Sequence, residues 1–266
     1  MTATLVSSPD ATKVNQSVAD EKHGAKLLGR CTFDAFEEMP YRDWFQKNQV
    51  ADFDPTITRR LAKRVDEEIS ITVFMGSWCG DSQRYVPRLF ALSKQVGLPA
   101  KRINLQLLDY AVGSYKRGPT GAERDELIHR VPTIIVRRGE QELGRIVESP
   151  MSSLEMDITQ ILEGLPPTPR YRLVPLADAW LKAHPEVAGG VWNQTLADEF
   201  VEQYEHDSSG DSELATFARV LYDRGDYEPA IAIAKLNVAM YPDSLSAMKR
   251  LMQAYQASHE SGSRDR

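Results

Sequence analysis

The segment that most limits what this chain can fold into runs from residue 69 to residue 82 and reads ISITVFMGSWCGDS. Its first seven residues are β-branched, apolar or aromatic, which is typical of a buried strand. A helix is predicted beyond the loop, because apolar residues recur there on one helical face and a glycine follows them: Tyr85, Leu89, Leu92, Val96, then Gly97. The segment therefore predicts an α/β fold, with Cys79 at the junction of a strand and a helix.

The rest of the first half of the chain repeats this alternation of strand and helix periods. Apolar and polar residues alternate in a second predicted strand, and two further runs flank a short turn as a hairpin. The predicted elements are a helix over 55–69, strands over 69–75 and 101–108, a short helix over 122–129, a hairpin of 132–137 with 142–147, and a helix over 153–162. This order predicts a central mixed sheet flanked by helices.

Composition changes divide the chain into predicted regions. A Pro-rich stretch, GLPPTP from residue 164, marks the end of the α/β part, and only helical patterns follow it. The predicted regions are a disordered tail over 1–25, an α/β domain with a helical lead-in over 26–164, a linker over 165–174, an all-helical domain over 175–258, and a disordered end over 259–266.

Charge and hydropathy exclude several classes of function. The 32 Lys and Arg residues are outnumbered by 38 Asp and Glu residues, so no basic surface for nucleic acid is expected. The apolar runs are too short to span a bilayer, which needs roughly 20 apolar residues, so no membrane contact is expected. The N-terminal residues do not have the pattern of a secretory signal, which predicts a cytoplasmic protein. The 2 cysteines lack metal-ligand spacing, so free thiols and no metal are expected.

Cys79 is the candidate for chemistry, because the free amide N–H groups at a helix N-terminus favour a thiolate. Such sites lower the pKa of a cysteine from about 8.5 and make the sulfur nucleophilic at neutral pH. The carboxylate of Asp81 acts in the opposite direction, because it disfavours a second negative charge. Ser82 could donate a hydrogen bond to the thiolate and favour the charged form.

Three motifs together give a resemblance to the thioredoxin superfamily over residues 57–162. Trp78 and Cys79 follow a hydrophobic strand, Pro87 stands in the helix where thioredoxins have a bending proline, and residues 130–133 (RVPT) open the next strand like the cis-proline segment of the family. The resemblance implies a thioredoxin-like fold, in which the segment before the proline holds a bound chain beside the sulfur. It assigns Cys79 and Ser82 as catalytic, Trp78, Val131 and Pro132 as substrate-binding, and Gly80, Asp81 and Pro87 as supporting residues.

Two departures from the family change the implied reaction. Thioredoxins have a second cysteine where this chain has Ser82, and a buried acidic residue where it has Val73. The resemblance therefore implies monothiol thiol–disulfide exchange or deglutathionylation at Cys79. Its partners would be protein thiols or disulfides, with glutathione or another small thiol as co-substrate and no other cofactor. The alternative is a redox-inactive adaptor that binds protein partners through the same face and the helical tail.

Other candidate residues have two interpretations each. Cys79 is either reactive or an inert, partly buried thiol. Cys31 is expected to be a packed small hydrophobe, with a distant resolving thiol as the alternative. His129 is expected on the surface, and as the alternative it is a proton acceptor near Cys79. The arginines near the loop are either solvated or attract an anionic thiol: Arg84, Arg88, Arg124 and Arg130.

Residues 214–242 resemble one tetratricopeptide repeat. The first helix has the family's order of large, large, small and large residues at Leu214, Phe217, Ala218 and Leu221. A Gly-Asp-Tyr turn follows, and the second helix has the small packing residues Ala230 and Ala234 and ends before Pro242. Stable arrays need three or more repeats, so the two helices of this single repeat must bury their apolar face against another part of the chain or a partner. We expect it to pack against other parts of this chain, and the alternative is a groove that binds a protein partner.

Overall fold

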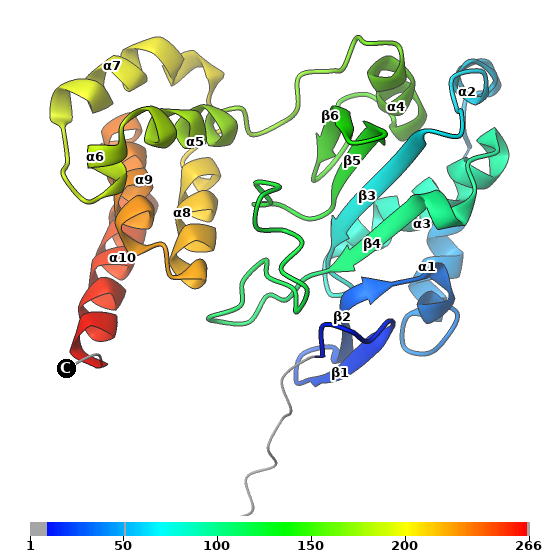
Figure 1. Cartoon of the computed structure of the whole chain (residues 1–266), viewed down its shortest axis with the longest axis horizontal. Helices are drawn as coiled ribbons and strands as arrows, with labels where there is room; N and C mark the ends of the chain where they lie inside the picture. Colours follow the sequence, from blue (N-terminus) through cyan, green and yellow to red (C-terminus); the bar gives the residue numbers. More distant parts are fainter. Residues whose placement is uncertain (1–9, 51, 265–266) are drawn as a thin grey trace, which may run out of the picture. The chain divides into compact units, whose positions relative to one another are not determined.

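The structure is a computed structural model that describes residues 10–50 and 52–264. Its chain contacts divide it into two compact units (Figure 1). The first unit contains the described residues up to Tyr110 and those from Lys116 to Pro169. The second unit contains Ala111–Tyr115 and the residues from Arg170 onward. The sequence places the division within 165–174, but it does not predict that five residues of the first half belong to the second unit.

One mixed sheet of six strands forms the centre of the first unit, in the order β1-β2-β4-β3-β5-β6. β3 and β4 run parallel, and every other neighbouring pair is antiparallel. The α/β class and the strands predicted after residue 69 are confirmed. The strands are β1 (Gln16–Asp20), β2 (Gly24–Cys31), β3 (Ile69–Met75), β4 (Ile103–Leu107), β5 (Thr133–Arg138) and β6 (Gln141–Val147).

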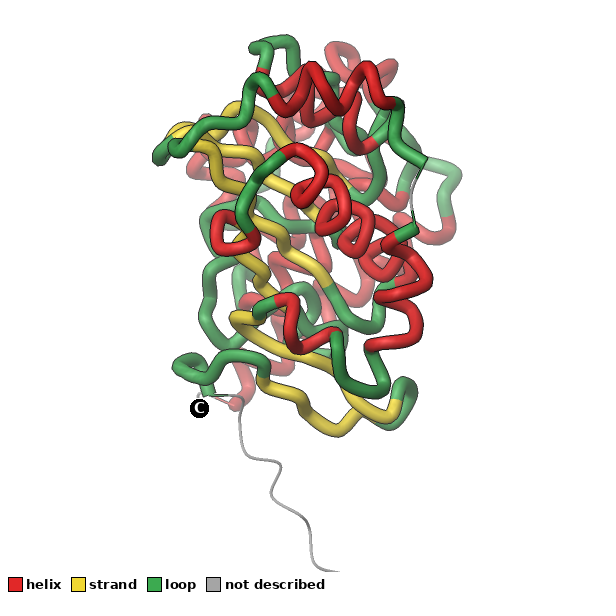
Figure 2. The backbone as a smooth tube through the Cα atoms, turned by 90° about the vertical axis from the view of Figure 1, so that its right-hand side faces the viewer, coloured by secondary structure: helices red, strands yellow, loops and turns green. Residues whose placement is uncertain are grey.

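Helices cover one face of this sheet, and they lie in front of the strands in Figure 2. Their apolar side chains form one core with the alternate residues Ile71, Val73 and Met75 of β3, as expected for side chains that alternate across a strand. The helices of this unit are α1 (Arg42–Gln49), α2 (Pro55–Ala62), α3 (Gly80–Val96) and α4 (Leu154–Leu162), with short 3-10 helices η1 (Phe33–Phe36) and η2 (Ala100–Arg102).

The other face of the sheet carries a second, smaller apolar cluster. Phe74 of β3 and Ile135 of β5 pack there with Leu108, Ile128 and Val131, and residues Trp78 and Cys79 lie against them. Residues 109–132 supply part of this cluster without forming a helix or strand. The candidate site therefore lies beside this second cluster, where β3 ends and α3 begins.

The prediction of a helix over 122–129 is wrong, because this segment forms turns and contains no helix. Gly121 has φ 67° and Leu127 has φ 53°, and both values lie in the left-handed region that a right-handed helix excludes. The charged residues of this stretch resemble the first turn of a helix. Their role is different, because Glu126 accepts hydrogen bonds from Arg137 of β5 at 2.6 and 2.7 Å.

The predictions of a disordered tail over 1–25 and of a helical lead-in from residue 26 are also wrong, because strands β1 and β2 lie in these regions. β1 and β2 form a hairpin, and β2 continues as the neighbour of β4, with Cys31 opposite Leu105. Leu27 and Leu28 are both buried, so they lack the alternation that marks a strand in the sequence. Helix begins only at η1. Residues 1–9 of the predicted tail lie outside the described residues.

In the described residues from 170 to 264, the second unit contains helices joined by turns and loops and no strand. α8, α9 and α10 contact one another and lie side by side in Figure 1. α10 continues to Arg264, so the predicted disorder over 259–266 is wrong for residues 259–264, whereas 265–266 lie outside the described residues. The helices are α5 (Leu173–Ala183), α6 (Pro185–Ala188), α7 (Gln194–Tyr204), η3 (Glu205–Asp207), α8 (Ser212–Arg224), α9 (Tyr227–Met240) and α10 (Leu245–Arg264).

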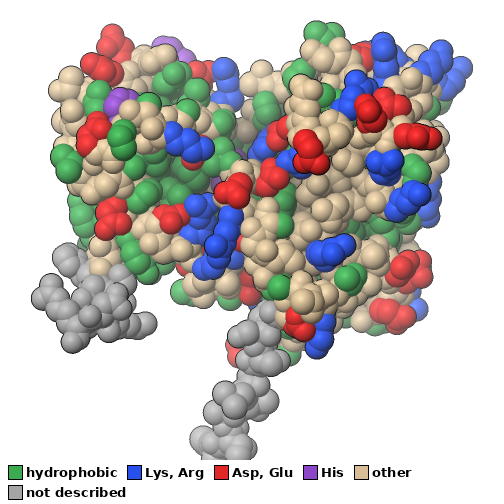
Figure 3. Space-filling model, viewed as in Figure 1, with side chains coloured by type: hydrophobic (Ala, Val, Ile, Leu, Met, Phe, Trp, Pro, Cys, Tyr) green, Lys and Arg blue, Asp and Glu red, His purple; other side chains and the backbone are tan. Residues whose placement is uncertain are grey.

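The pair α8 and α9 buries the residues that carry the repeat-like pattern. Leu214, Phe217 and Ala218 of α8 and Ala230 and Ala234 of α9 are each at most 2% exposed. In the view of Figure 3, hydrophobic side chains nevertheless form a surface patch over this helical unit. In the part of the chain that the structure describes, no helix has both the length and the apolar character needed to cross a bilayer.

Candidate functional site

Cys79 is the N-cap residue of α3, directly after the loop that leaves β3. Its backbone is extended, with φ −92° and ψ 125°, and its carbonyl oxygen accepts the first intrahelical bond from Gln83 N–H at 2.9 Å. The Cys79 N–H donates to Gly76 O at 3.0 Å, which closes the loop. The half-buried sulfur therefore lies at the positive end of a 17-residue helix, where negative charge is stabilised.

The Sγ of Cys79 lies 3.2 Å from the carbonyl oxygen of Val131, to which the thiol donates. The peptide bond between Val131 and Pro132 is cis. Pro132 in turn accepts from Glu148 N–H at 2.7 Å, so the chain beyond β6 lies beside the same segment. The structure thus brings together the two motifs that the sequence assigns to one site, Cys79 and the Val131–Pro132 segment. Both Val131 and Pro132 are buried.

Trp78 is held from several sides. Its Nε1 donates to Leu108 O at 2.8 Å, the ring of Tyr110 lies 4.9 Å away between centroids, and Lys116 Nζ lies 4.6 Å from the Trp78 ring. Gly76 is required beneath the indole, because a Cβ at that position would lie 2.4 Å from the ring. Trp78 remains half-buried, so part of its ring is available to a molecule approaching Cys79.

Ser82 does not have the predicted contact with the sulfur. It is fully buried, and its hydroxyl oxygen accepts from Gly76 N–H at 3.2 Å. No hydrogen bond joins Ser82 to Cys79 among the residues that the structure describes. The reason is geometric: a residue three positions after the N-cap lies within the first turn, and here its side chain faces the end of β3. Ser82 stabilises the loop.

Gly80 and Asp81 form the exposed side of the site. Gly80 is exposed, with no heavy atom within 4 Å of a Cβ placed there, and Asp81 is half-buried. Burial raises the pKa of the Asp81 carboxyl, and the negative charge of Glu148 adds to this effect, while Arg84 opposes it. The Glu148 carboxylate that acts on Asp81 is itself paired with Arg130 at 3.6 Å. Glu148 was missed in the sequence, because no local spacing indicates that a residue after β6 lies here.

Pro87 lies inside α3 and is buried. A proline in this position cannot donate the hydrogen bond to the carbonyl four residues earlier, and such residues bend a helix. The first turn of α3, which carries Cys79, is therefore separated from the rest of the helix by this interruption. Pro87 does not contact the sulfur in any hydrogen bond and acts on the shape of the helix.

Cys31 and His129 are both buried, and burial shifts the pKa of each away from neutral pH. Burial raises the pKa of the Cys31 thiol to about 12, so almost no thiolate forms at neutral pH. This agrees with a packed residue and argues against a resolving thiol. His129 is only 4% exposed, so the predicted surface position is wrong. Burial lowers its pKa to about 4, which leaves the ring neutral at pH 7.

Lys116 is a second residue that the sequence did not indicate. It is only 5% exposed, and its ammonium group lies over the Trp78 ring, where a cation is attracted by the π-electrons. The sequence pattern around Lys116 predicts only an irregular stretch, because the contact depends on the path of residues 109–132. Among residues 10–50 and 52–264, no group of three His, Cys, Asp or Glu side chains has the arrangement of a metal site.

Comparisons with protein-family models, with curated proteins and with solved structures gave no match for this chain. The molecule is thus defined by its own architecture, as an α/β unit with a mixed six-stranded sheet and a second unit made of helices. Its site is defined by a cysteine at a helix N-terminus beside a buried cis X-Pro segment.

Proposed function

We propose that this chain is a thioredoxin-like protein in which Cys79 carries out monothiol thiol–disulfide exchange. The observation that carries the proposal is the position of the sulfur. Cys79 is the N-cap residue of α3 and is partly exposed, and its Sγ lies 3.2 Å from the carbonyl oxygen of Val131, the residue before Pro132. This is the arrangement that the resemblance to the thioredoxin superfamily implies for a nucleophilic cysteine.

The order of the elements supports the same proposal. The sequence of β3, α3 and β4 is followed by the hairpin of β5 and β6 and by α4. Cys79 lies at the first junction of strand and helix, and Pro132 directly precedes β5. These are the positions that the resemblance gives to the cysteine and to the cis-proline segment.

The proposed reaction has two exchanges. The Cys79 thiolate attacks one sulfur of a disulfide, a Cys79 mixed disulfide forms, and the other sulfur leaves as a thiolate that takes up a proton. A small thiol such as glutathione, as its thiolate, then attacks the partner's sulfur in the mixed disulfide, forms a new disulfide with it and releases Cys79 as a thiolate. The second step needs an external thiol, because Ser82 replaces the second cysteine of thioredoxins and Cys31 is buried in the core.

The surroundings of the sulfur suggest how a partner would approach. Gly80 is exposed and Asp81 and Trp78 are half-buried, so the disulfide would reach Cys79 along these residues. When Cys79 loses its proton, the Val131 carbonyl loses its donor and becomes free to accept from a backbone N–H of the partner. The reaction requires a compartment that keeps thiols reduced, and we place it in the cytoplasm.

The test is adduct formation with glutathione disulfide, followed by intact-mass and peptide mass spectrometry. The unchanged protein is expected to gain one glutathione on Cys79 and to lose it again when reduced glutathione is added. Cys79→Ser should not form the adduct, whereas Cys31→Ser, which is the matched control, should form it at the same rate. Circular dichroism would verify that both variants are folded.

An unmodified protein, or an adduct on Cys31, would contradict the proposal. The first result would favour the alternative, a redox-inactive adaptor. A specific observation is relevant to that alternative: α10 exposes Leu245, Met248 and Met252 to the extent of 81%, 40% and 62%. These residues fall on one side of the helix at spacings of three and four and offer an apolar surface to a protein partner.

A further inference from the structure

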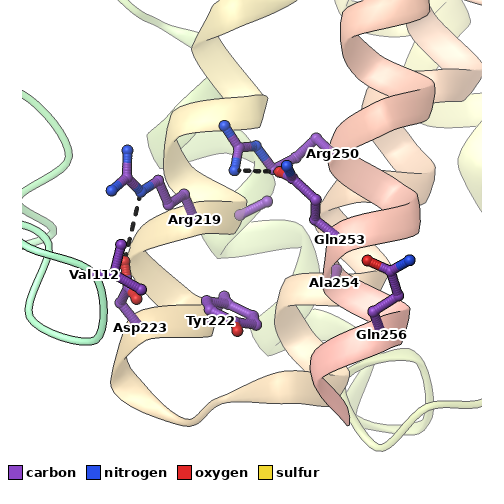
Figure 4. Close-up of a pocket in the computed structure, with 9 residues that line it drawn as sticks. Val112, Arg219, Tyr222, Asp223, Arg250, Gln253, Ala254 and Gln256 are labelled. Atoms are coloured by element: carbon purple, nitrogen blue, oxygen red, sulfur yellow. Dashed lines mark hydrogen bonds and ion pairs between the residues drawn. The ribbon is translucent and has the colours of Figure 1, made fainter. Parts of the chain in front are cut away.

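The helical unit contains a cavity of about 420 Å³ that the proposed function does not use. α8 and α10 form its two sides, and Val112 from the segment Ala111–Tyr115, which belongs to the same unit, lies at its edge (Figure 4). Its volume falls in the range of sites for small molecules, roughly 300 to 1,000 Å³. The lining residues are Val112, Ala218, Arg219, Tyr222, Asp223, Arg250, Gln253, Ala254 and Gln256.

One of the two arginines in this cavity has its charge balanced. Arg219 lies 3.5 Å from the Asp223 carboxylate, and its guanidinium stacks at 3.7 Å on the ring of Tyr115. Asp223 also accepts from Gly113 N–H at 2.8 Å. Arg219 and Asp223 together therefore contribute no net charge, and both have structural partners that hold the segment Ala111–Tyr115.

Arg250 supplies the remaining positive charge. Its Nη1 donates to the neutral amide oxygen of Gln253 at 2.8 Å, and its buried Nε has no acceptor in the described part of the chain. No ion pair of Arg250 with a carboxylate is present among the described residues. In Figure 4 the Arg250 side chain extends from α10 toward α8, across the cavity. The cavity thus has one guanidinium with free donors and a net positive charge.

The surroundings make this charge unfavourable in the absence of an anion. Burial lowers the pKa of the Arg250 guanidinium, and the positive charge of Arg219 lowers it further, while Tyr115 and Asp223 act in the opposite direction. A negative group placed against Arg250 would offset both effects and would supply an acceptor for its Nε. A planar guanidinium is suited to hold a carboxylate or a phosphate through two parallel hydrogen bonds.

Besides the charged residues and the two glutamines, the cavity is lined by apolar and aromatic residues. Ala218 and Ala254 are 1% and 3% exposed, and Val112 is 89% exposed at the rim. The Tyr222 ring lies between α8 and α10 in Figure 4, at the side of the cavity away from the Arg250 head. A molecule with its charge at Arg250 would therefore place its remaining atoms against Tyr222 and the two alanines.

We propose that this cavity is a binding site for a small organic anion, with a carboxylate or phosphate at Arg250 and an apolar, preferably aromatic, body against Tyr222. The site is independent of Cys79, and its occupation requires no reaction there. Carboxylate and phosphate are both oxyanions that can accept hydrogen bonds from Arg250, and separate probes distinguish between them.

The test is a titration of the full-length protein with benzoate and with phenyl phosphate, followed by ¹H–¹⁵N correlation spectra or calorimetry. Saturable shifts of the amides of α8 and α10 are expected with at least one probe, and the tighter probe identifies the head group. Arg250→Gln should weaken binding about tenfold or more, because a charge-assisted pair is replaced by a neutral contact. Arg250→Lys, which keeps the charge, should retain part of the affinity.

The matched control is Lys249→Gln, which removes an exposed cation from the neighbouring position of α10 and lies outside the cavity lining. Its affinity should equal that of the unchanged protein. Inorganic phosphate, which lacks the aromatic body, and benzyl alcohol, which lacks the charge, should each bind more weakly than the tighter of the two probes. The proposal is overturned if neither probe binds, if Lys249→Gln has the same effect as Arg250→Gln, or if inorganic phosphate or benzyl alcohol binds as tightly as the tighter probe.

Discussion

Gly76 allows the Trp78 ring to lie against the loop between β3 and α3. The ring occupies the space that a side chain at residue 76 would need, and its Nε1 is fixed by Leu108 O at 2.8 Å. The indole, the loop and the sulfur at residue 79 are therefore positioned by one packing arrangement. A change at this glycine should affect both stability and the reactivity of the site.

Gly76→Ala is expected to lower the free energy of unfolding by about 1 to 3 kcal/mol, because the added methyl group overpacks the loop. It should also slow the glutathione adduct at Cys79, since the Trp78 ring must move. Gly80→Ala is the control for stability, because a Cβ there meets no atom within 4 Å. Urea unfolding and mass spectrometry measure the two effects. Equal free energies of unfolding for the two variants, or an unchanged rate of adduct formation in Gly76→Ala, would show that the indole does not position the site.

His129 makes stability depend on pH. Burial lowers its pKa from 6.5 to about 4, so the unfolded chain binds a proton more readily than the folded protein between these values. Stability must therefore rise with pH through this window and be lost as the pH falls from 6.5 toward 4. The two pKa values correspond to about 3 kcal/mol at pH 4 relative to pH 7.

Urea unfolding at a series of pH values should detect the pH-dependent contribution of His129 to the free energy of unfolding. It would appear as a difference between the unchanged protein and His129→Gln. The variant lacks the titrating ring, so its loss of stability between pH 7 and pH 4 should be about 3 kcal/mol smaller. His206→Gln serves as the control, because that side chain is 94% exposed. Parallel pH profiles for the protein and His129→Gln would contradict the assignment of a buried, neutral ring.

At the scale of elements, the sequence predicted those segments whose own periodicity decides their structure. β3 is a continuous apolar run, and α3 has a full stripe ending at Gly97, whose φ of 79° is that of a left-handed cap. These local signals placed Cys79 correctly at a helix N-terminus. The hairpin of β5 and β6 and the helix α4 were predicted for the same reason, and the structure contains all of them.

Elements that depend on distant partners were not predictable in this way. β2 is a strand because it pairs with β1 and β4, and residues 122–129 are turns because Gly121 and Leu127 have left-handed backbones. The same limit applies to the site. The sequence could place Ser82 in the first turn of α3, but only the packing directs its hydroxyl to Gly76 and brings Glu148 close to Asp81.

The N-terminus of α2 is stabilised by a side-chain cap whose contribution can be measured. Asp54 is its N-cap, and one carboxylate oxygen accepts from Thr56 N–H at 2.7 Å and from Ile57 N–H at 3.2 Å. Asp54→Ala should therefore lower the free energy of unfolding by about 1 kcal/mol, because two amide donors lose their acceptor. Asp54→Asn, which can still cap the helix, should lose much less. Thermal or urea unfolding measures both, and the cap has no such role if the two variants are equally destabilised.

At the scale of the whole molecule, each of the two units has its own buried groups. In the helical unit the Glu213 carboxylate is 1% exposed and accepts from Leu173 N–H at 2.6 Å and from Ser209 N–H at 3.0 Å. It ties the beginnings of α5 and α8 together. Removing such a buried acceptor leaves two backbone N–H donors without a partner and lowers the free energy of unfolding.

Glu213→Ala is expected to destabilise the helical unit by about 1 to 3 kcal/mol and to leave the α/β unit less affected. Hydrogen exchange followed by mass spectrometry would show this as lost protection in α5 and α8, with smaller change in β3. Glu199→Ala, which alters an exposed carboxylate on α7, is the control and should change little. Equal loss of protection in β3 and α8 would instead show that the two units unfold together.

The segment Ala111–Tyr115 gives the helical unit a discontinuous sequence. Gly113 and Tyr115 supply contacts to Asp223 and Arg219 of α8, although more than fifty residues of the α/β unit follow them in the chain. A carboxyl-terminal fragment that begins at the linker would consequently lack Ala111–Tyr115 and its contacts with α8. The helical unit therefore cannot be transferred complete to another protein as one continuous segment of the gene.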